Sequence, residues 1–148
     1  MDSKEILLDL ETQKKIVISL KSSNSYPHEV SYIKIKETHM SWIILTGLYA
    51  YKIKKILLND KKETRTRFNR LKICQKEIEL NKVLAPKLYI GVSKVIRLKD
   101  NSIFINSCDK VHEDEDYKFL DVATKMYEFP EESLLKGLVN SNQIDEYS

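Results

Sequence analysis

The sequence predicts an α+β fold in which an antiparallel sheet of five or six strands packs against one long helix. Residues 42–55 hold two extended runs joined by Thr46-Gly47, a pattern typical of a β-hairpin. Residues 88–106 repeat this pattern around the turn Lys99-Asp-Asn101. Between the two hairpins, residues 64–84 contain neither glycine nor proline, so they can form an uninterrupted helix.

The overall composition indicates one globular domain. The chain has 148 residues, of which 42% are hydrophobic and 32% are charged, and this is enough for one buried core. The formal net charge is +3 and the pI is near 8.7, whereas the pI of a nucleic-acid-binding domain usually exceeds about 9. We therefore expect no nucleic-acid partner, and the lysines and arginines between Lys52 and Arg70 leave that class as the weakest alternative.

Cysteine use and hydropathy favour a cytoplasmic location. Cys74 and Cys108 are far apart and have no CxxC motif or cluster of histidines beside them, so neither a metal site nor a disulfide framework is expected. Two reduced cysteines are typical of the cytosol. The N-terminal residues mix acids with apolar residues, unlike a signal peptide, and no window holds the roughly 20 apolar residues of a membrane span. We expect no membrane partner.

The N-terminal part of the chain predicts a helix and then a strand. Asp2 and Glu5 have capping-box spacing, and apolar residues follow them at loosely helical intervals. Tyr26-Pro27 ends this helix and begins a loop, in which His28 is expected to be an exposed residue rather than a ligand. Val30–Lys36 alternates and, together with the first hairpin, predicts a three-stranded antiparallel meander.

The second strand of the first hairpin has one bulky and one basic face, because side chains alternate along a strand. The residues on the two faces are Tyr49, Tyr51 and Ile53 on one, and Ala50, Lys52 and Lys54 on the other. A small residue lets a flat ring approach the strand, and an ammonium group two residues further on can reach phosphates. The basic face is therefore the candidate site for chemistry.

The long helix carries one acid on its apolar side. Asp60 and Glu63 have capping-box spacing at its start, and Pro86 ends it. The predicted apolar arc consists of Leu71, Ile73, Cys74, Ile78, Leu80, Leu84 and Ala85. Glu77 lies inside this arc, where an ionised carboxylate is costly unless it is paired or solvated. Either it lies at a solvated rim, or it forms an ion pair with a lysine of the sheet, for which Lys52 is the candidate.

The C-terminal third predicts a last strand and a short helix. The acidic run Glu113–Asp116 and the neighbouring His112 are interpreted as a solvated loop rather than a metal site. Phe119–Met126 is predicted to be the last strand, Phe129-Pro130 interrupts it, and Glu131–Leu138 begins the helix. The residues after this helix are expected to form a polar tail.

The order of these elements and a set of short motifs resemble the small lobe of the protein-kinase-like fold. The motifs are Tyr26-Pro-His28, Glu37-Thr-His39, Ser41-Trp42, Leu45-Thr-Gly47, Tyr49-Ala-Tyr-Lys-Ile-Lys-Lys55, Glu77, Leu80-Asn81, Leu84-Ala-Pro86, Leu88-Tyr89, Lys125-Met126 and Phe129-Pro130. They cover most of residues 26–138. The chain is thereby similar to the N-terminal lobe of the aminoglycoside-phosphotransferase-like domain that bacterial bifunctional proteins carry fused to a P-loop ATPase or gluconate-kinase-like domain.

The resemblance implies a single domain over residues 1–148 with three parts. A helix and loop occupy residues 1–25, the kinase-like small lobe occupies residues 26–129, and a helix that follows the hinge, with a tail, occupies residues 130–148. The large lobe of the family would be absent from this sequence.

The resemblance also implies nucleotide-binding roles for five residues. Ala50 would lie over adenine, and Lys52 would hold the α- and β-phosphates of ATP. Glu77 would orient Lys52, as the helix glutamate of kinases orients the strand lysine. Lys125 and Met126 would lie at the hinge, where backbone groups meet the edge of adenine.

For other residues near the implied phosphate site, the resemblance leaves more than one role open. Lys54 and Lys55 are competing phosphate contacts, because strand alternation puts Lys54 on the basic face while the motif match favours Lys52. His39 and Ser41 fall in the turn over the phosphates, but the chain has no glycine-rich GxGxxG motif.

The implied function is one half of an ATP-dependent small-molecule phosphotransferase. The resemblance places the catalytic aspartate and the Mg²⁺ ligands on the large lobe, so no catalytic and no metal-binding residue is assigned in this chain. We expect ATP as the nucleotide, Mg²⁺ only together with the large lobe, and no catalysis by this chain alone. The protein partner would be a complementary large-lobe chain or a second copy. The alternative is a non-catalytic nucleotide-binding or protein-interaction module.

Overall fold

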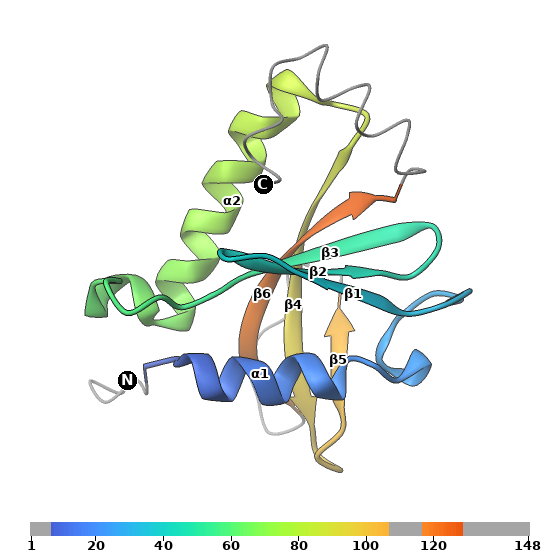
Figure 1. Ribbon diagram of the computed structural model, residues 1–148, viewed down its shortest axis with the longest axis horizontal. Coiled ribbons are helices and arrows are strands. Elements are labelled where there is room, and N and C mark those ends of the chain that lie inside the picture. The colour runs from blue at the N-terminus through green and yellow to red at the C-terminus, as the bar shows by residue number, and fades with distance from the viewer. Residues whose placement is uncertain (1–6, 107–116, 129–148) are drawn as a thin grey trace.

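The fold comes from a computed structural model, which describes residues 7–106 and 117–128. In these residues one sheet packs against two α-helices (Figure 1). The helical elements are α1 (Leu10–Ser19), the 3₁₀ turns η1 (Ser23–Ser25) and η2 (Lys62–Arg65), and α2 (Arg67–Leu84). The strands are β1 (Lys34–Glu37), β2 (Ser41–Leu45), β3 (Tyr49–Lys54), β4 (Tyr89–Leu98), β5 (Ile103–Asn106) and β6 (Tyr117–Tyr127). The predicted α+β class is confirmed, with six strands.

The strand order across the sheet is β1-β2-β3-β6-β4-β5, and every neighbouring pair is antiparallel. The predicted hairpins are confirmed as β2-β3 and β4-β5, and β1 completes the predicted meander. The last strand, predicted at Phe119–Met126, is confirmed as β6. It lies between the two hairpins and joins them into one sheet (Figure 1), so the final strand in the sequence is a central strand in space.

Two residues with positive φ allow the tight hairpin turns. Gly47, in the β2-β3 turn, has a φ of 114°, and a Cβ atom there would lie 3.0 Å from the side chain of Ser31. Asn101, in the β4-β5 turn, has a φ of 71°, a conformation that asparagine tolerates better than most residues. β1 is shorter than predicted, because Lys34 lies opposite Leu45, the last residue of β2; before Lys34, Ser31 donates its amide to the carbonyl of Thr46 in the turn.

The two helices cover opposite faces of the sheet. The largest apolar cluster joins α1 to the bulky face of β3 and includes Ile16, Val17, Leu20, Tyr51 and Ile53. On the other face, α2 packs Cys74 and Ile78 against Val122 of β6. Ala50 lies on this second face, in a small cluster with Leu88, Tyr89 and Met126. The predicted alternation of β3 is therefore confirmed.

The start of α1 differs from the prediction. Asp2 and Glu5 lie outside the described residues, and the helix begins at Leu10. Asp9 is its N-cap, because Oδ1 accepts a hydrogen bond of 2.7 Å from the amide of Thr12. This backbone hydrogen bond holds the pKa of Asp9 below its ordinary value.

The start and the apolar face of α2 also differ from the prediction. Asp60 caps nothing in the helix; its carboxylate accepts a hydrogen bond from the amide of Leu57 instead. α2 begins after Thr66, whose Oγ1 accepts from the amide of Asn69 at 3.2 Å. Cys74 and Ile78 of the predicted arc are buried, but three other members are exposed: Ile73, Leu80 and Leu84. The predicted arc spans half the helix circumference, whereas the sheet covers a narrower stripe.

The remaining predicted elements lie outside the described residues. These are the acidic loop with His112 and Glu113–Asp116, and the helix and tail of residues 130–148. In the part of the chain that is described, no helix is long and apolar enough to cross a membrane.

Replacing Thr66 by alanine removes the N-cap of α2, and we expect this to destabilise the protein by about 1 kcal/mol. Thr66→Ser keeps a hydroxyl that can accept from Asn69 and should retain most of the stability. Urea unfolding followed by far-UV circular dichroism measures both variants. Equal stability of the alanine and serine variants would show that the hydroxyl of residue 66 does not cap the helix.

Candidate functional site

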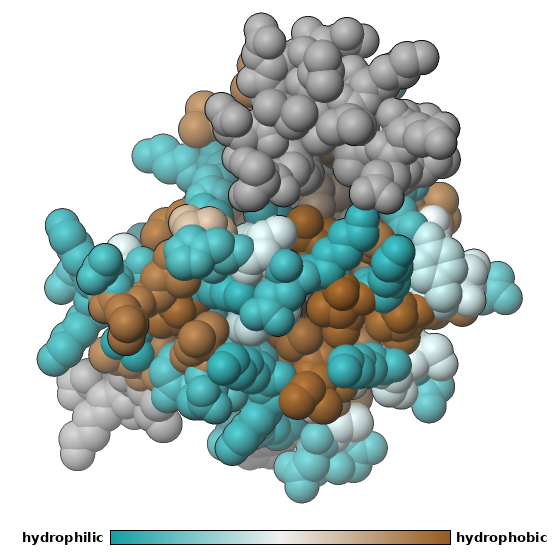
Figure 2. All heavy atoms as spheres, in the orientation of Figure 1, coloured by the Kyte–Doolittle hydropathy of each residue, from teal (hydrophilic) through white to brown (hydrophobic). Residues whose placement is uncertain are grey.

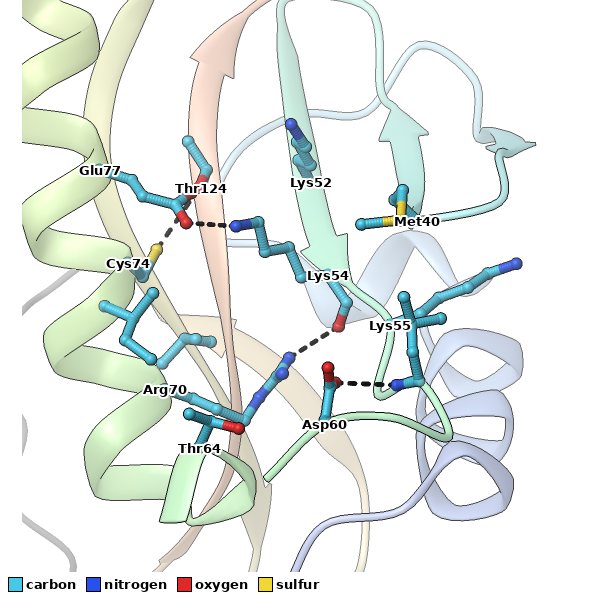
Figure 3. Close-up of a pocket in the computed structure, with 13 residues that line it drawn as sticks. Met40, Lys52, Lys54, Lys55, Asp60, Thr64, Arg70, Cys74, Glu77 and Thr124 are labelled. Carbon is cyan, nitrogen blue, oxygen red and sulfur yellow. Dashed lines mark hydrogen bonds and ion pairs between the residues drawn. The ribbon is translucent and has the colours of Figure 1, made fainter. Parts of the chain in front are cut away.

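A cavity of about 240 Å³ lies between the C-terminal end of β3 and the N-terminal half of α2. Figure 3 shows the side chains around it, which come from the β1-β2 turn, β3, the segment before α2, α2 and β6. Its polar lining residues are Lys52, Lys54, Lys55, Asp60, Thr64, Arg70, Glu77 and Thr124. Cys74 also lines it; its thiol lies 3.4 Å from Oγ1 of Thr124, and burial raises the pKa of this thiol. The predicted basic face of β3 thus borders a cavity.

Glu77 forms an ion pair with Lys54, not with the predicted Lys52. Lys52 projects from the same face of β3 and lines the same cavity (Figure 3). Strand alternation identified this face correctly, but residues i and i+2 of a strand lie about 6.6 Å apart along it. Which of them meets the helix acid depends on where α2, which packs on β6 and β4, lies relative to β3, and its side chains reach the last residue of that strand, Lys54.

The Lys54–Glu77 ion pair is accessible to solvent. The side chain of Lys54 is 48% exposed and that of Glu77 is 37% exposed. Ion pairs with this exposure contribute only about 0–1 kcal/mol, because water screens them. Glu77 is therefore both paired and near a rim, which combines the two alternatives that its position in the sequence left open. An anion that enters the cavity can compete with Glu77 for the ammonium group.

The backbone of Lys54 is held much more firmly than its side chain. Its carbonyl accepts a hydrogen bond from Nη2 of Arg70 and another from Nε2 of Gln13, each 2.8 Å long. Arg70 also donates from Nε to Oδ1 of Asp121 at 2.8 Å. Arg70 is 8% exposed, and Gln13 and Asp121 are completely buried. None of these three residues was predicted. Two signals for them are present in the sequence: Arg70 lies on the same side of the helix as Cys74, and Asp121 lies inside an apolar strand.

Lys55 is paired with an acid outside the cavity. Its Nζ lies 2.6 Å from Oε2 of Glu37 and 5.1 Å from the centroid of the Trp42 ring. The hydrogen bond and the charge of Lys55 hold the pKa of Glu37 below its ordinary value. Of the competing phosphate contacts predicted for this strand, Lys55 is therefore the less suitable and Lys54 the more suitable.

The β1-β2 turn has few backbone donors to offer an anion. His39 lies exposed in this turn, and Ser41 is the first residue of β2. Oγ1 of Thr38 accepts hydrogen bonds from the amides of Met40 and Ser41, at 3.3 and 3.0 Å. Because these amides already have an acceptor, the turn lacks the free N–H groups of a glycine-rich phosphate loop.

Lys125 and Met126 lie inside β6 rather than in a segment that follows it, so their predicted placement at a hinge is corrected. In the antiparallel register, Met126 is opposite Ala50 of β3 and Tyr89 of β4, and Lys125 is opposite Tyr51. The backbone of a central strand pairs on both sides, which leaves little for a nucleotide base. The next two amides are also used: Tyr127 donates to the carbonyl of Leu88, and Glu128 donates to that of Leu48.

The side chain of Lys125 belongs to an aromatic cluster on the α1 face. Its Nζ lies 4.2 Å from the centroid of the Tyr49 ring, and burial lowers its pKa. His28, predicted to be exposed, is half-buried in the same cluster: Nε2 lies 2.7 Å from the hydroxyl oxygen of Tyr51, and the two rings are parallel. The sequence position of His28 after a proline gave no sign of these contacts, which join segments 23 residues apart.

Comparisons with known proteins give no function. No family model matches the chain, and no solved structure matches it. Over 62 residues it is 37% identical to an uncharacterized protein of Mycobacterium bovis and to two uncharacterized proteins of Mycobacterium tuberculosis. The match covers 42% of this chain and only 12% of the length of each relative. These relatives are therefore much longer proteins, of which the chain resembles a small part.

We expect the Glu37–Lys55 pair to stabilise the folded state at neutral pH but not in acid. Because the pKa of Glu37 is lower in the folded state, its contribution is complete above the ordinary glutamate pKa and is lost as the pH falls through the folded-state pKa. Glu37→Gln should therefore lose less stability than the wild type between about pH 6 and pH 3.

Chemical denaturation at a series of pH values measures this difference. Glu79→Gln, which removes an exposed carboxylate of α2, is the matched control. If the Glu37→Gln curve runs parallel to the wild-type curve at every pH, the pair does not contribute as expected.

Proposed function

We propose that this chain is the nucleotide-binding half of an ATP-dependent small-molecule phosphotransferase of the aminoglycoside-phosphotransferase-like kind, corresponding to its small lobe. The observation that best supports this proposal is the cavity lined by Lys52 and Lys54 of β3, in which Lys54 pairs with Glu77 of α2. A strand lysine paired with a helix glutamate is the arrangement that kinase-like small lobes use to hold the phosphates of ATP. In the proposal, Lys54 takes the paired position and Lys52 is the second phosphate contact.

The face of the β2-β3 ribbon changes from apolar to cationic along its length. Three opposite pairs of residues follow one another on this face: Leu45 with Ala50, Ile43 with Lys52, and Ser41 with Lys54. Leu45 and Ile43 are partly buried members of the apolar cluster around Ala50. A nucleotide has the same polarity, with a flat base at one end and phosphates at the other. We place the base against the apolar pairs and the phosphates at the two lysines.

The exposure of the Lys54–Glu77 pair suits ligand exchange. A phosphate group carries more negative charge than one carboxylate and can accept hydrogen bonds from both ammonium groups. Because the existing pair is weakly held, its rearrangement costs little free energy. The proposal assigns no catalytic aspartate and no Mg²⁺ ligand in this chain; both would be supplied by a large lobe.

We expect ATP to bind the chain, and we expect Lys52→Ala and Lys54→Ala each to weaken binding by about tenfold, the effect of one lost charge-assisted hydrogen bond. Lys99→Ala, which removes an exposed lysine from the β4-β5 turn, should bind like the wild type. Isothermal titration calorimetry at low salt measures the affinities. Equal affinity for ATP in all four proteins would refute the assignment of the phosphate site.

The alternative function is a protein-interaction module. Five apolar side chains of α2 are 39–80% exposed: Phe68, Ile73, Leu80, Val83 and Leu84. Figure 2 shows hydrophobic surface over α2 among hydrophilic side chains. Such surface is typical of a contact site. Under this alternative, sedimentation velocity should show association that increases with protein concentration and is abolished in Leu80→Ser, while ATP has no effect. A monomer at all concentrations would count against self-association through α2.

A further inference from the structure

We propose that Arg70, Asp121 and Gln13 are positioning residues of the lysine-lined cavity, which hold Lys54 where it can meet Glu77 or a phosphate. This inference rests on the proposed function, because it assigns these residues a role in ligand binding that acts through Lys54. Of the three, Arg70 lines the cavity, whereas Gln13 and Asp121 do not. The residue that these three side chains hold is the same one whose ammonium group pairs with Glu77.

The side chains of Arg70 and Gln13 take the place of a backbone donor that the carbonyl of Lys54 lacks on the β6 side. The ladder between β3 and β6 ends at the pair Lys52 and Thr124. Two residues further on, the carbonyl of Lys54 accepts from Arg70 and from Gln13, which fill both lone pairs of its oxygen. Lys54 is also the last residue of β3, so this carbonyl is fixed at the point where the chain leaves the strand.

Asp121 in turn orients both donors. Its Oδ1 accepts from Nε of Arg70, and its Oδ2 accepts from Nε2 of Gln13 at 3.0 Å. Gln13 has two amide hydrogens, and the second is the one donated to Lys54. Its Oε1 accepts from the amide of Ile56 at 2.8 Å, so the same side chain also holds the segment after β3. Each of these side chains is therefore held in the one orientation that makes all of its hydrogen bonds.

Two residues of α2 contact Lys54, one at its backbone and one at its ammonium group. Arg70, Cys74 and Glu77 are separated by four and three residues, so they lie on one side of the helix. Arg70 holds the backbone of Lys54 while Glu77, two turns further along, holds its ammonium group. The position of α2 relative to β3 therefore sets both contacts, and a change at Arg70 alters how Lys54 is presented to the cavity.

A double-mutant cycle tests this role, since residues that act through one another have non-additive effects. Arg70→Lys keeps a cation beside Asp121 but loses the planar fork that donates to Asp121 and to Lys54 at once. In the full chain, we expect Arg70→Lys to weaken ATP binding by about fivefold in calorimetric titration. In a Lys54→Ala background the same change should have an effect below about twofold, because the ammonium group that it misplaces is gone.

The outcomes separate this inference from the proposed function. If the wild-type chain does not bind ATP, the proposed function fails and this inference fails with it. If it binds, but Arg70→Lys weakens binding equally in both backgrounds or in neither, only the positioning role is overturned. Gln13→Met, which removes the other donor to Lys54 without adding a charge, repeats the cycle if Arg70→Lys does not fold, as judged by circular dichroism, and must show the same dependence on Lys54.

Discussion

The buried ion pair between Arg70 and Asp121 is the interaction on which the surrounding structure depends. Asp121 is completely buried, and its carboxylate accepts from Arg70, Gln13 and the amide of Val122. Through these bonds one residue of β6 connects α1, α2 and the end of β3. A buried charge that loses its partner typically costs about 3–5 kcal/mol, so the network is stable only when all its members are present. This requirement couples the two helices, which otherwise lie on opposite faces of the sheet.

The cavity combines a buried, hydrogen-bonded backbone with a solvent-accessible ammonium group. The carbonyl of Lys54 is fixed by buried donors, whereas its ammonium group is half-exposed and paired with a half-exposed acid. Rigid placement of the backbone limits where the ammonium group can go, and weak pairing allows it to change partner. A binding site needs both properties, because a ligand contact must be available without a large cost in free energy.

Local patterns predicted the strands well, because their signals are local. Turn residues such as Gly47 and Asn101 and the alternation of β3 were sufficient for both hairpins and for the basic face. The helix starts were less predictable. Asp60 and Thr66 both have side chains that can cap a helix, and the choice of Thr66 depends on where α2 must begin in order to place Arg70 on Asp121.

Contacts between distant elements were not predictable from patterns alone. The sequence identifies Lys52 and Lys54 as equivalent residues of one face, and only the position of α2 on β6 and β4 decides that Glu77 meets Lys54. Arg70 and Asp121 are 51 residues apart; Arg70 is one of several basic residues at the start of α2, whereas Asp121 is a charged residue in an apolar strand. Such a residue needs a partner, but the sequence does not say which of many charged residues supplies it. The motif match misplaced Lys125 and Met126 for a related reason, since a short motif cannot distinguish the end of a strand from the segment that follows it.

β6 holds the β2-β3 ribbon at both ends. At one end, Asp121 directs Arg70 and Gln13 to the carbonyl of Lys54. At the other end, Glu128 follows β6, donates its amide to Leu48, and accepts at Oε1 from the amide of Gly47 in the β2-β3 turn. Between these two points, Ala50 and Lys52 lie opposite Met126 and Thr124 of β6. One neighbouring strand therefore holds both the apolar and the cationic part of the ribbon in place, and this strand is the last of the six described strands in the sequence.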